Sequence, residues 1–236
     1  MSENPKTAKL TDHDHNRMVF TKDDWINDWE KCRTDGDPLY WHMNSVHPAL
    51  EKYYELLTDG EPCRIFVPWC GKSLDLNWLY KRKHTVVGVE LFEPGVLELF
   101  QESGLDYVKE AAGPFTLYRT KDSRLKVFAG DAFLLTKDLI GHDFNVIWDR
   151  GAFNACNEDD REKYVQQMLS LVAPNVKYML ETFEFTSDDM KSMTTCNAVK
   201  PSFGSKFNIK ELYRINSDFC TESNEMKEVL FLLTLR

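Results

Sequence analysis

The chain has 236 residues and a formal net charge of −9, which fits one domain with a single substantial core. The acidic balance argues against a nucleic-acid partner, because phosphate binding needs a basic face. No stretch reaches the roughly 20 apolar residues of a membrane span, and the polar N-terminus does not resemble a secretory signal, so we expect neither a membrane nor a secreted protein. The six cysteines form no CxxC pair, and we expect free thiols in a cytoplasmic protein.

The first residues are polar and low in apolar content, so we predict a disordered tail over residues 1–20 and a single domain over 21–236. His13, Asp14 and His15 lie in this tail. Three adjacent residues of a flexible segment rarely complete a coordination shell. We therefore expect no metal site.

A helix is predicted from Thr21, because Thr21 and Asp24 fit an N-cap and its acidic partner three residues later. Trp25 and Trp29 stand four residues apart and share one helical face. This helix either packs its aromatic side chains on the core or forms a lid that covers a ligand. We predict an N-terminal lid over residues 21–60, followed by the core.

Four apolar runs then predict the strands of an α/β sheet. Buried parallel strands have near-continuous apolar sequences, and each run ends in a polar or glycine-containing corner. The carboxyl ends of such strands lie at one edge, where open α/β sheets bind ligands. The four predicted strands are 64–70, 85–91, 125–131 and 144–149.

Helix signals separate these strands. Ser73 can cap the helix after the first strand, and Pro94 and Gly104 fit the first turn and the C-terminal cap of the next. Asn157 and Asp160 are predicted to cap a further helix after the fourth strand. These strand–helix–strand units predict right-handed crossovers in a parallel sheet.

The remaining segments complete a predicted seven-stranded sheet, which is mostly parallel with helices on both faces. Its last strand must run antiparallel, because a brief turn around Ser223 and Asn224 is too short for a parallel crossover. This Rossmann-like arrangement resembles class I S-adenosylmethionine-dependent methyltransferases. The segments are an irregular stretch over 109–124 with a hairpin through 116–119, a fifth strand over 176–183, a short helix over 209–213, and strands over 218–222 and 227–235.

Three motifs carry a closer resemblance: Pro-Trp-Cys-Gly-Lys at 68–72, Gly-Val-Glu at 88–90 and Trp-Asp-Arg-Gly-Ala at 148–152. In this order, and with Trp25 and Trp29 upstream, they resemble the thiopurine S-methyltransferase family. The resemblance implies S-adenosyl-L-methionine as methyl donor, S-adenosyl-L-homocysteine as product and a sulfur acceptor. It also implies that the two tryptophans contact the donor.

The residue types at these corners support a donor site. Gly71 permits backbone amides to approach the donor's carboxylate, and Glu90, nineteen residues later, is placed to accept ribose hydroxyls. Asp131 and Ala132 are expected beside the adenine, although a loop-capping role explains Asp131 equally well. Trp69 packs near the donor or fills the core.

The resemblance places Arg150 over the transferred methyl group, in contact with both donor and acceptor. Its guanidinium can attract an anionic acceptor and stabilise a thiolate, whereas the alternative is an ion pair with Asp149. We predict Asp149 and Arg150 as catalytic residues, with Asp149 assisting proton removal, and Trp41 as part of the acceptor cavity. His42 and His47 are expected to be ordinary surface or helix residues.

The sequence thus predicts a monomeric S-methyltransferase that acts on a small thiol or a related sulfur or selenium nucleophile. Such a displacement chiefly needs proximity and alignment, so the need for a general base stays open. Trp69 replaces the leucine of the family, and the brief final turn replaces a longer basic segment. Thiopurines, small thiols, selenols, hydrosulfide and halide therefore all stay open as acceptors. A halide or hydrosulfide methyltransferase and a non-catalytic donor-binding module are the alternatives, and the absence of G-x-G-x-x-G disfavours a nicotinamide oxidoreductase.

Overall fold

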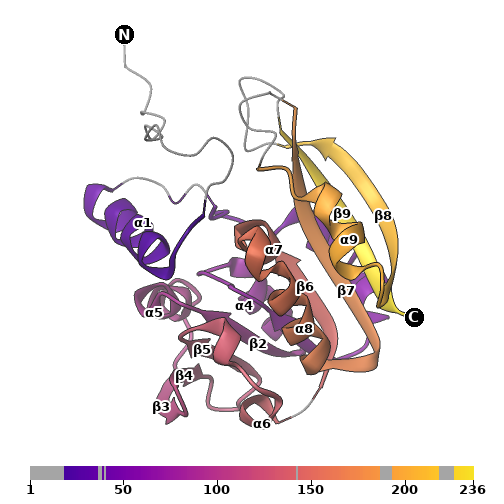
Figure 1. Cartoon of the computed structure of the whole chain (residues 1–236). Helices are drawn as coiled ribbons and strands as arrows, with labels where there is room; N and C mark the ends of the chain where they lie inside the picture. The colour runs from indigo at the N-terminus through magenta and orange to yellow at the C-terminus, as the bar shows by residue number, and fades with distance from the viewer. Residues whose placement is uncertain (1–18, 37–38, 40, 142, 187–192, 218–225) are drawn as a thin grey trace.

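The computed structural model describes residues 19–36, 39, 41–141, 143–186, 193–217 and 226–236. Within these residues nine strands form one sheet in the order β3-β4-β5-β2-β1-β6-β7-β9-β8, with helices against both faces (Figure 1). The strands are β1 Arg64–Val67, β2 Thr85–Glu90, β3 Val108–Ala112, β4 Phe115–Arg119, β5 Leu125–Ala129, β6 Phe144–Arg150, β7 Val172–Phe185, β8 Phe207–Asn216 and β9 Met226–Leu235.

The central strands β5, β2, β1, β6 and β7 run parallel, as the sequence predicts. Ile65 of β1 pairs with Val86 of β2 and with Val146 of β6, so the strand order reverses at β1. β9 is antiparallel to β7, which confirms the predicted direction of the last strand. Open α/β sheets bind ligands at the carboxyl ends of the strands beside such a reversal.

The predicted count of seven strands is wrong. β3 and β4 form an antiparallel hairpin that extends the edge of the sheet beyond β5. The predicted hairpin at 116–119 falls within β4, and β3 lies in the stretch that reads as irregular. Most of β3 is exposed, so it lacks the apolar alternation that marks a half-buried strand.

The short helix predicted over 209–213 is also wrong, because this segment belongs to β8. The pairing of β8 with β9 shifts register between Glu211 and Tyr213, and such a bulge disturbs the alternation by which a strand is recognised. The predicted strand 218–222 lies outside the described residues. The predicted brief turn around Ser223 and Asn224 lies outside them as well.

Helices α2 to α5 cover one face of the sheet and α6 to α9 cover the other, around two clusters of buried side chains. Ser73 caps α4, since its hydroxyl oxygen accepts the Asp75 N–H at 3.2 Å, and Pro94 lies in the first turn of α5, both as predicted. Among the described residues, no helix has the length and apolar character needed to cross a bilayer. The helices are α1 Lys22–Asp35, α2 Pro48–Lys52, α3 Tyr54–Thr58, α4 Leu74–Lys81, α5 Glu93–Glu102, α6 Lys137–Ile140, α7 Ala152–Ala155, α8 Arg161–Leu171 and α9 Cys196–Phe203.

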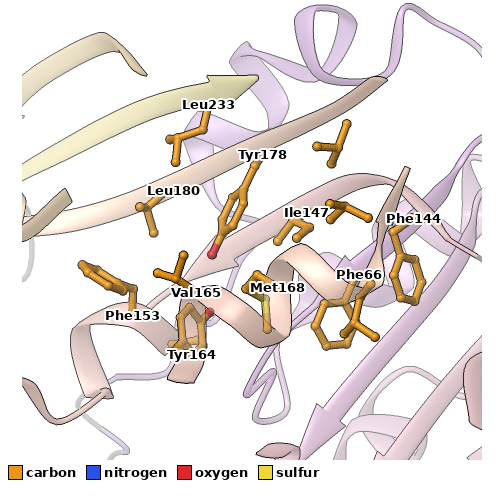
Figure 2. Packing of buried hydrophobic residues seen from close by; sticks show 14 of the residues in the cluster. Phe66, Phe144, Ile147, Phe153, Tyr164, Val165, Met168, Tyr178, Leu180 and Leu233 are labelled. Atoms are coloured by element: carbon orange, nitrogen blue, oxygen red, sulfur yellow. The ribbon is translucent and has the colours of Figure 1, made fainter. Parts of the chain in front are cut away.

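The core between α8 and the sheet holds large aromatic side chains (Figure 2). Phe153, Tyr164 and Tyr178 are at most 1% exposed, and burying a large apolar side chain contributes about 1.5–3 kcal/mol. Tyr164 and Tyr178 turn their hydroxyl oxygens toward each other beneath α8 (Figure 2). These two buried hydroxyls need a hydrogen-bond acceptor within the apolar layer.

Candidate active site

A cavity of about 410 Å³ lies at the carboxyl ends of β1, β2, β5 and β6. Small-molecule sites commonly measure roughly 300–1,000 Å³. The cavity is lined by nine of the ten residues that the sequence assigns to the donor and acceptor sites. These nine are Trp25, Trp29, Trp41, Trp69, Gly71, Glu90, Asp131, Ala132 and Arg150.

The corner after β1 bends sharply beside this cavity. Trp69 and Gly71 have positive φ angles of 43° and 52°, a conformation that glycine adopts freely and that costs other residues about 1–3 kcal/mol. The Cys70 N–H donates to the Val89 carbonyl at 2.9 Å and ties the corner to β2. Strained backbone concentrates at ligand sites, so the geometry favours a binding loop.

Glu90, the last residue of β2, presents a buried carboxylate to the cavity and is 6% exposed. Its Oε2 accepts the Gly71 N–H at 2.8 Å, and its Oε1 accepts the Phe92 N–H at 2.9 Å. Burial raises the pKa of Glu90, and the amide hydrogen bonds oppose that shift only in part. Each oxygen retains a further acceptor site, so two adjacent ligand hydroxyls can be held here.

Asp131 follows β5 and has two partners, one in its own loop and one in α1. Its Oδ1 accepts the Phe133 N–H at 3.0 Å and caps the 3-10 turn Ala132–Leu134, so the loop-capping role is present. The Asp131 carboxylate also pairs with Lys22, the first residue of α1. The β5 corner and the N-terminal segment are thus joined at the edge of the cavity.

Helix α1 forms a wall of the cavity and lies near α5 (Figure 1). The capping box predicted for its first turn is present. Trp29 is 4% exposed, stacks on Phe92 with 5.2 Å between ring centroids and meets Trp41 edge to face at 5.4 Å. A Cβ on Gly95 of α5 would lie 3.1 Å from the Trp29 ring, so this glycine lets α1 approach closely.

Phe20 falls within the predicted tail 1–20, yet it lines the cavity. The Phe20 N–H donates to Asn157 Oδ1 at 3.0 Å, and Asn157 Nδ2 donates to the Phe20 carbonyl at 2.8 Å. The predicted capping of α8 by Asn157 and Asp160 is wrong, because neither side chain makes a capping hydrogen bond. The rest of the tail, residues 1–18, lies outside the described residues.

Arg150 lines the cavity at the end of β6. Its Nε lies 3.4 Å from Glu181 Oε2, and its guanidinium donates to the Trp41 carbonyl. The carboxylate that pairs with Arg150 is therefore that of Glu181, on β7, instead of Asp149. This pairing holds the guanidinium at the cavity wall.

His47 is 3% exposed and also lines the cavity, so the prediction of an ordinary surface or helix residue is wrong for His47. His42 lines the cavity as well and is half-buried. His47 Nε2 lies 2.8 Å from Glu181 Oε1, and its Nδ1 accepts the Ala49 N–H at 3.2 Å. Burial opposes protonation of His47, but the Glu181 carboxylate raises its pKa overall. His47 and Arg150 thus flank one buried carboxylate.

Three buried side chains beside Arg150 are of the types that ligate metal ions. His47, Glu181 and Glu228 bring ligand atoms within 4.8 Å of one another. However, the Glu181 carboxylate already lies between His47 and the Arg150 guanidinium. A permanent cation at this distance repels a metal ion, so we interpret the group as an ion-pair cluster.

Asp149 is the predicted site residue that is missing from the described cavity lining. It is fully buried, its Oδ2 accepts the hydroxyls of Tyr164 and Tyr178, both at 2.6 Å, and its Oδ1 accepts the Phe153 N–H at 3.2 Å. Successive strand residues face opposite sides of a sheet, so Asp149 faces α8 while Arg150 faces the cavity. We infer a structural role for Asp149 in place of the predicted catalytic one.

Comparison with known proteins decides the family. The thiopurine S-methyltransferase (TPMT) family profile matches residues 20–233. The chain belongs to this family. Among its relatives are a probable thiopurine S-methyltransferase of Danio rerio, 33% identical over 84% of this chain and 86% of that protein, and the thiopurine S-methyltransferase of Bos taurus, 33% identical over 84% and 81%. A bacterial relative from Stutzerimonas stutzeri is 33% identical over 76% and 70%.

Solved structures match at lower identity. A SAM-dependent methyltransferase from Anabaena variabilis has a TM-score of 0.64 and 14% identity over 94% of this chain and 98% of that chain. A Burkholderia thailandensis 1,6-didemethyltoxoflavin-N1-methyltransferase, solved with S-adenosylhomocysteine, has a TM-score of 0.60 and 16% identity over 91% and 87%. These matches show that this thiopurine S-methyltransferase family member has the α/β fold of S-adenosylmethionine-dependent methyltransferases.

The family motifs indicate neither Glu181 nor His47. Glu181 lies within the predicted strand 176–183, and a charged residue in a buried strand needs a partner, so the sequence contained a signal for it. His47 precedes Pro48, which suits the first turn of a helix, but nothing in the sequence connects this cap to a distant strand.

Removing the Asp149 carboxylate tests its role in this family member. Asp149→Ala leaves the hydroxyls of Tyr164 and Tyr178 without their acceptor, so the free energy of unfolding should fall by about 2–4 kcal/mol. The folded fraction should retain near wild-type kcat/KM per molecule. Denaturant titration and kinetics of the same sample measure both, and a selective loss of kcat at unchanged stability would restore the catalytic assignment.

Proposed function

We propose that this chain transfers the methyl group of S-adenosylmethionine to a small thiol or a related sulfur or selenium nucleophile. The observation that carries the proposal is a single cavity that joins the Gly71 corner and the Glu90 carboxylate to the Arg150 guanidinium. The first two suit the donor's carboxylate and ribose, and the third suits a polarised acceptor. Membership of the thiopurine S-methyltransferase family supports a sulfur acceptor.

The cavity residues fit this donor. Glu90 offers oxygens that two backbone amides already orient. Trp25, Trp29 and Trp41 line the site, and aromatic rings favour a neighbouring sulfonium cation. When bound, the donor supplies an electrophilic methyl group. Holding both reactants in line supplies most of the required acceleration.

Arg150 is the residue proposed to act on the acceptor. A free thiol has a pKa of about 8.5 and is a few per cent thiolate at neutral pH, and a neighbouring cation increases that fraction. The Glu181 and Trp41 contacts fix the guanidinium in advance. A dedicated base is then not required, which agrees with the burial of Asp149 away from the cavity.

We further propose that α1 is a lid whose docking excludes water from the reaction. Trp29→Ala removes the ring that fills the space between Phe92 and Gly95. Because the aromatic contacts that dock α1 are lost, kcat/KM should fall about tenfold or more. The control is Trp78→Ala, because Trp78 packs on Arg82 away from the cavity. Hydrogen exchange should show added protection of α1 with S-adenosylhomocysteine; unchanged exchange contradicts a moving lid.

The decisive functional experiment is a mass-spectrometric screen for S-adenosylhomocysteine and methylated product. The acceptors are 2-mercaptoethanol, 3-mercaptopropionate, a selenol, hydrosulfide, iodide and a thiopurine. Turnover with thiols or selenols supports the proposal, whereas turnover with iodide or hydrosulfide alone favours a halide or hydrosulfide methyltransferase. Donor binding without turnover of any acceptor favours a non-catalytic binding module.

A cytoplasmic monomer is the proposed working form. Cys63, Cys70, Cys156 and Cys196 are free thiols, which supports a reducing compartment. Size-exclusion chromatography with light scattering tests the monomer.

A further inference from the structure

Behind Arg150 lies a buried group of charged side chains that the proposed methyl transfer does not use. We call this group the rear charge cluster; it consists of Arg150, Glu181, His47, Asp75 and Glu228. It combines β6, β7, α4, β9 and the segment before α2. All of its members except Arg150 are less than a tenth exposed, so solvent screens their interactions weakly.

Glu181 is the carboxylate of the cluster that faces Arg150. Its two oxygens lie 3.4 Å from Arg150 Nε and 2.8 Å from His47 Nε2. Burial disfavours the charged form, yet His47 and Arg150 lower the pKa of Glu181 overall. Glu181 therefore carries a full negative charge directly behind the guanidinium.

The other two carboxylates have different hydrogen-bond partners. Asp75 accepts the His47 backbone N–H at 2.9 Å and the Trp148 indole N–H at 2.8 Å. Glu228 accepts the Ser217 hydroxyl at 2.7 Å, and burial raises its pKa. Glu181 is the carboxylate of the cluster that pairs with the Arg150 guanidinium, and His47 shares that carboxylate.

This arrangement affects anionic and neutral acceptors differently. An anion beside Arg150 competes with Glu181 for the same guanidinium and is repelled by the Glu181 carboxylate. A thiol without a further charged group meets these charges only at its ionised sulfur, and both kinds of acceptor share that contribution. His47, whether as a hydrogen-bond donor or as a cation, offsets part of the Glu181 charge.

We propose that Glu181 and His47 determine whether the acceptor site prefers anionic or neutral nucleophiles. They do so by determining how strongly Glu181 neutralises the Arg150 charge that faces the acceptor. The inference rests on the proposed function, since it requires Arg150 to face the acceptor. Glu181 and His47 are positioning and specificity residues that act through Arg150. Their effects on specificity have opposite signs, which loss of packing alone does not produce.

Kinetics with two thiols of similar size test this, namely 3-mercaptopropionate, which carries a carboxylate, and 2-mercaptoethanol, which is neutral. Glu181→Gln keeps the side-chain shape and removes the charge, so the ratio of kcat/KM for the anionic over the neutral thiol should rise at least about tenfold, the change that two unit charges about 12 Å apart produce at an effective dielectric constant of about 20. His47→Ala removes one of the two groups that pair with Glu181, so the Glu181 carboxylate neutralises Arg150 more strongly. The same ratio should therefore fall several-fold.

Matched variants separate this effect from a loss of stability. Glu184→Gln removes a carboxylate of the same strand that pairs with Arg214 outside the cavity, and its ratio should equal the wild-type ratio. Glu181→Asp retains the charge and should retain a ratio close to wild type. If Glu181→Gln does not fold, a fall of the ratio in His47→Ala supports the proposal, and a rise or an unchanged ratio overturns it.

The outcomes distinguish the two proposals. An unchanged ratio in Glu181→Gln, or changes of the same sign in Glu181→Gln and His47→Ala, overturns the assignment of specificity while leaving S-methylation intact. If the wild-type protein methylates neither these thiols nor any other acceptor in the screen, the proposed function itself fails.

Discussion

Arg150→Ala is expected to separate acceptor capture from donor capture. The affinity for S-adenosylhomocysteine should stay close to wild type, whereas kcat/KM for 3-mercaptopropionate should fall about 10- to 100-fold, because a hydrogen bond to a charged group contributes about 1.5–3 kcal/mol. The loss for 2-mercaptoethanol should be smaller. Isothermal calorimetry and steady-state kinetics of one preparation give all three values.

Two further variants make this result specific. Arg150→Lys should recover only part of the loss, because an ammonium lacks the planar fork of the guanidinium. Arg214→Ala removes an arginine that pairs with Glu184 and Glu211 away from the cavity, and it should leave the thiol preference unchanged. Equal losses for both thiols together with a lower Tm would identify Arg150 as a structural partner of Glu181, and the acceptor site would then be sought among the aromatic residues of α1.

Glu90→Ala is expected to have the largest effect on the donor. Two ligand hydroxyls would lose a charged acceptor, and at about 1.5–3 kcal/mol each the affinity for S-adenosylhomocysteine should fall by about 100-fold or more. Calorimetry measures this directly. Glu93→Gln is the matched control, because Glu93 pairs with Lys109 and Tyr118 outside the cavity; a folded Glu90→Ala protein with wild-type affinity would refute the ribose assignment.

The parallel core is predictable because its signals are local. β2 is buried at every position after the first, its residues 86–89 are apolar or glycine, and α4 begins at the recognisable cap Ser73. The edges lack such signals. β3 is exposed, and β8 contains a register shift, so neither shows the periodicity on which a strand prediction depends.

The residues of the candidate site likewise divide into those with a local sequence signal and those without one. Gly71, Glu90 and Arg150 lie at strand ends in short motifs, and the fold topology alone brings those ends together. The pairing of Glu181 with His47 joins β7 to the segment before α2, which no local pattern specifies. Strand alternation also separates Asp149 from Arg150, although the two are adjacent in the sequence.

The contact between Asn157 and Phe20 fastens the segment before α1 at the cavity. Asn157 binds the backbone N–H and carbonyl of Phe20, so the strength of this latch does not depend on the side chain at position 20. Lys22 and Asp131 add a second, charged tie, which salt weakens while leaving the first in place. We therefore expect substitutions at these polar contacts to shorten the residence time of a bound ligand without altering the aromatic interior.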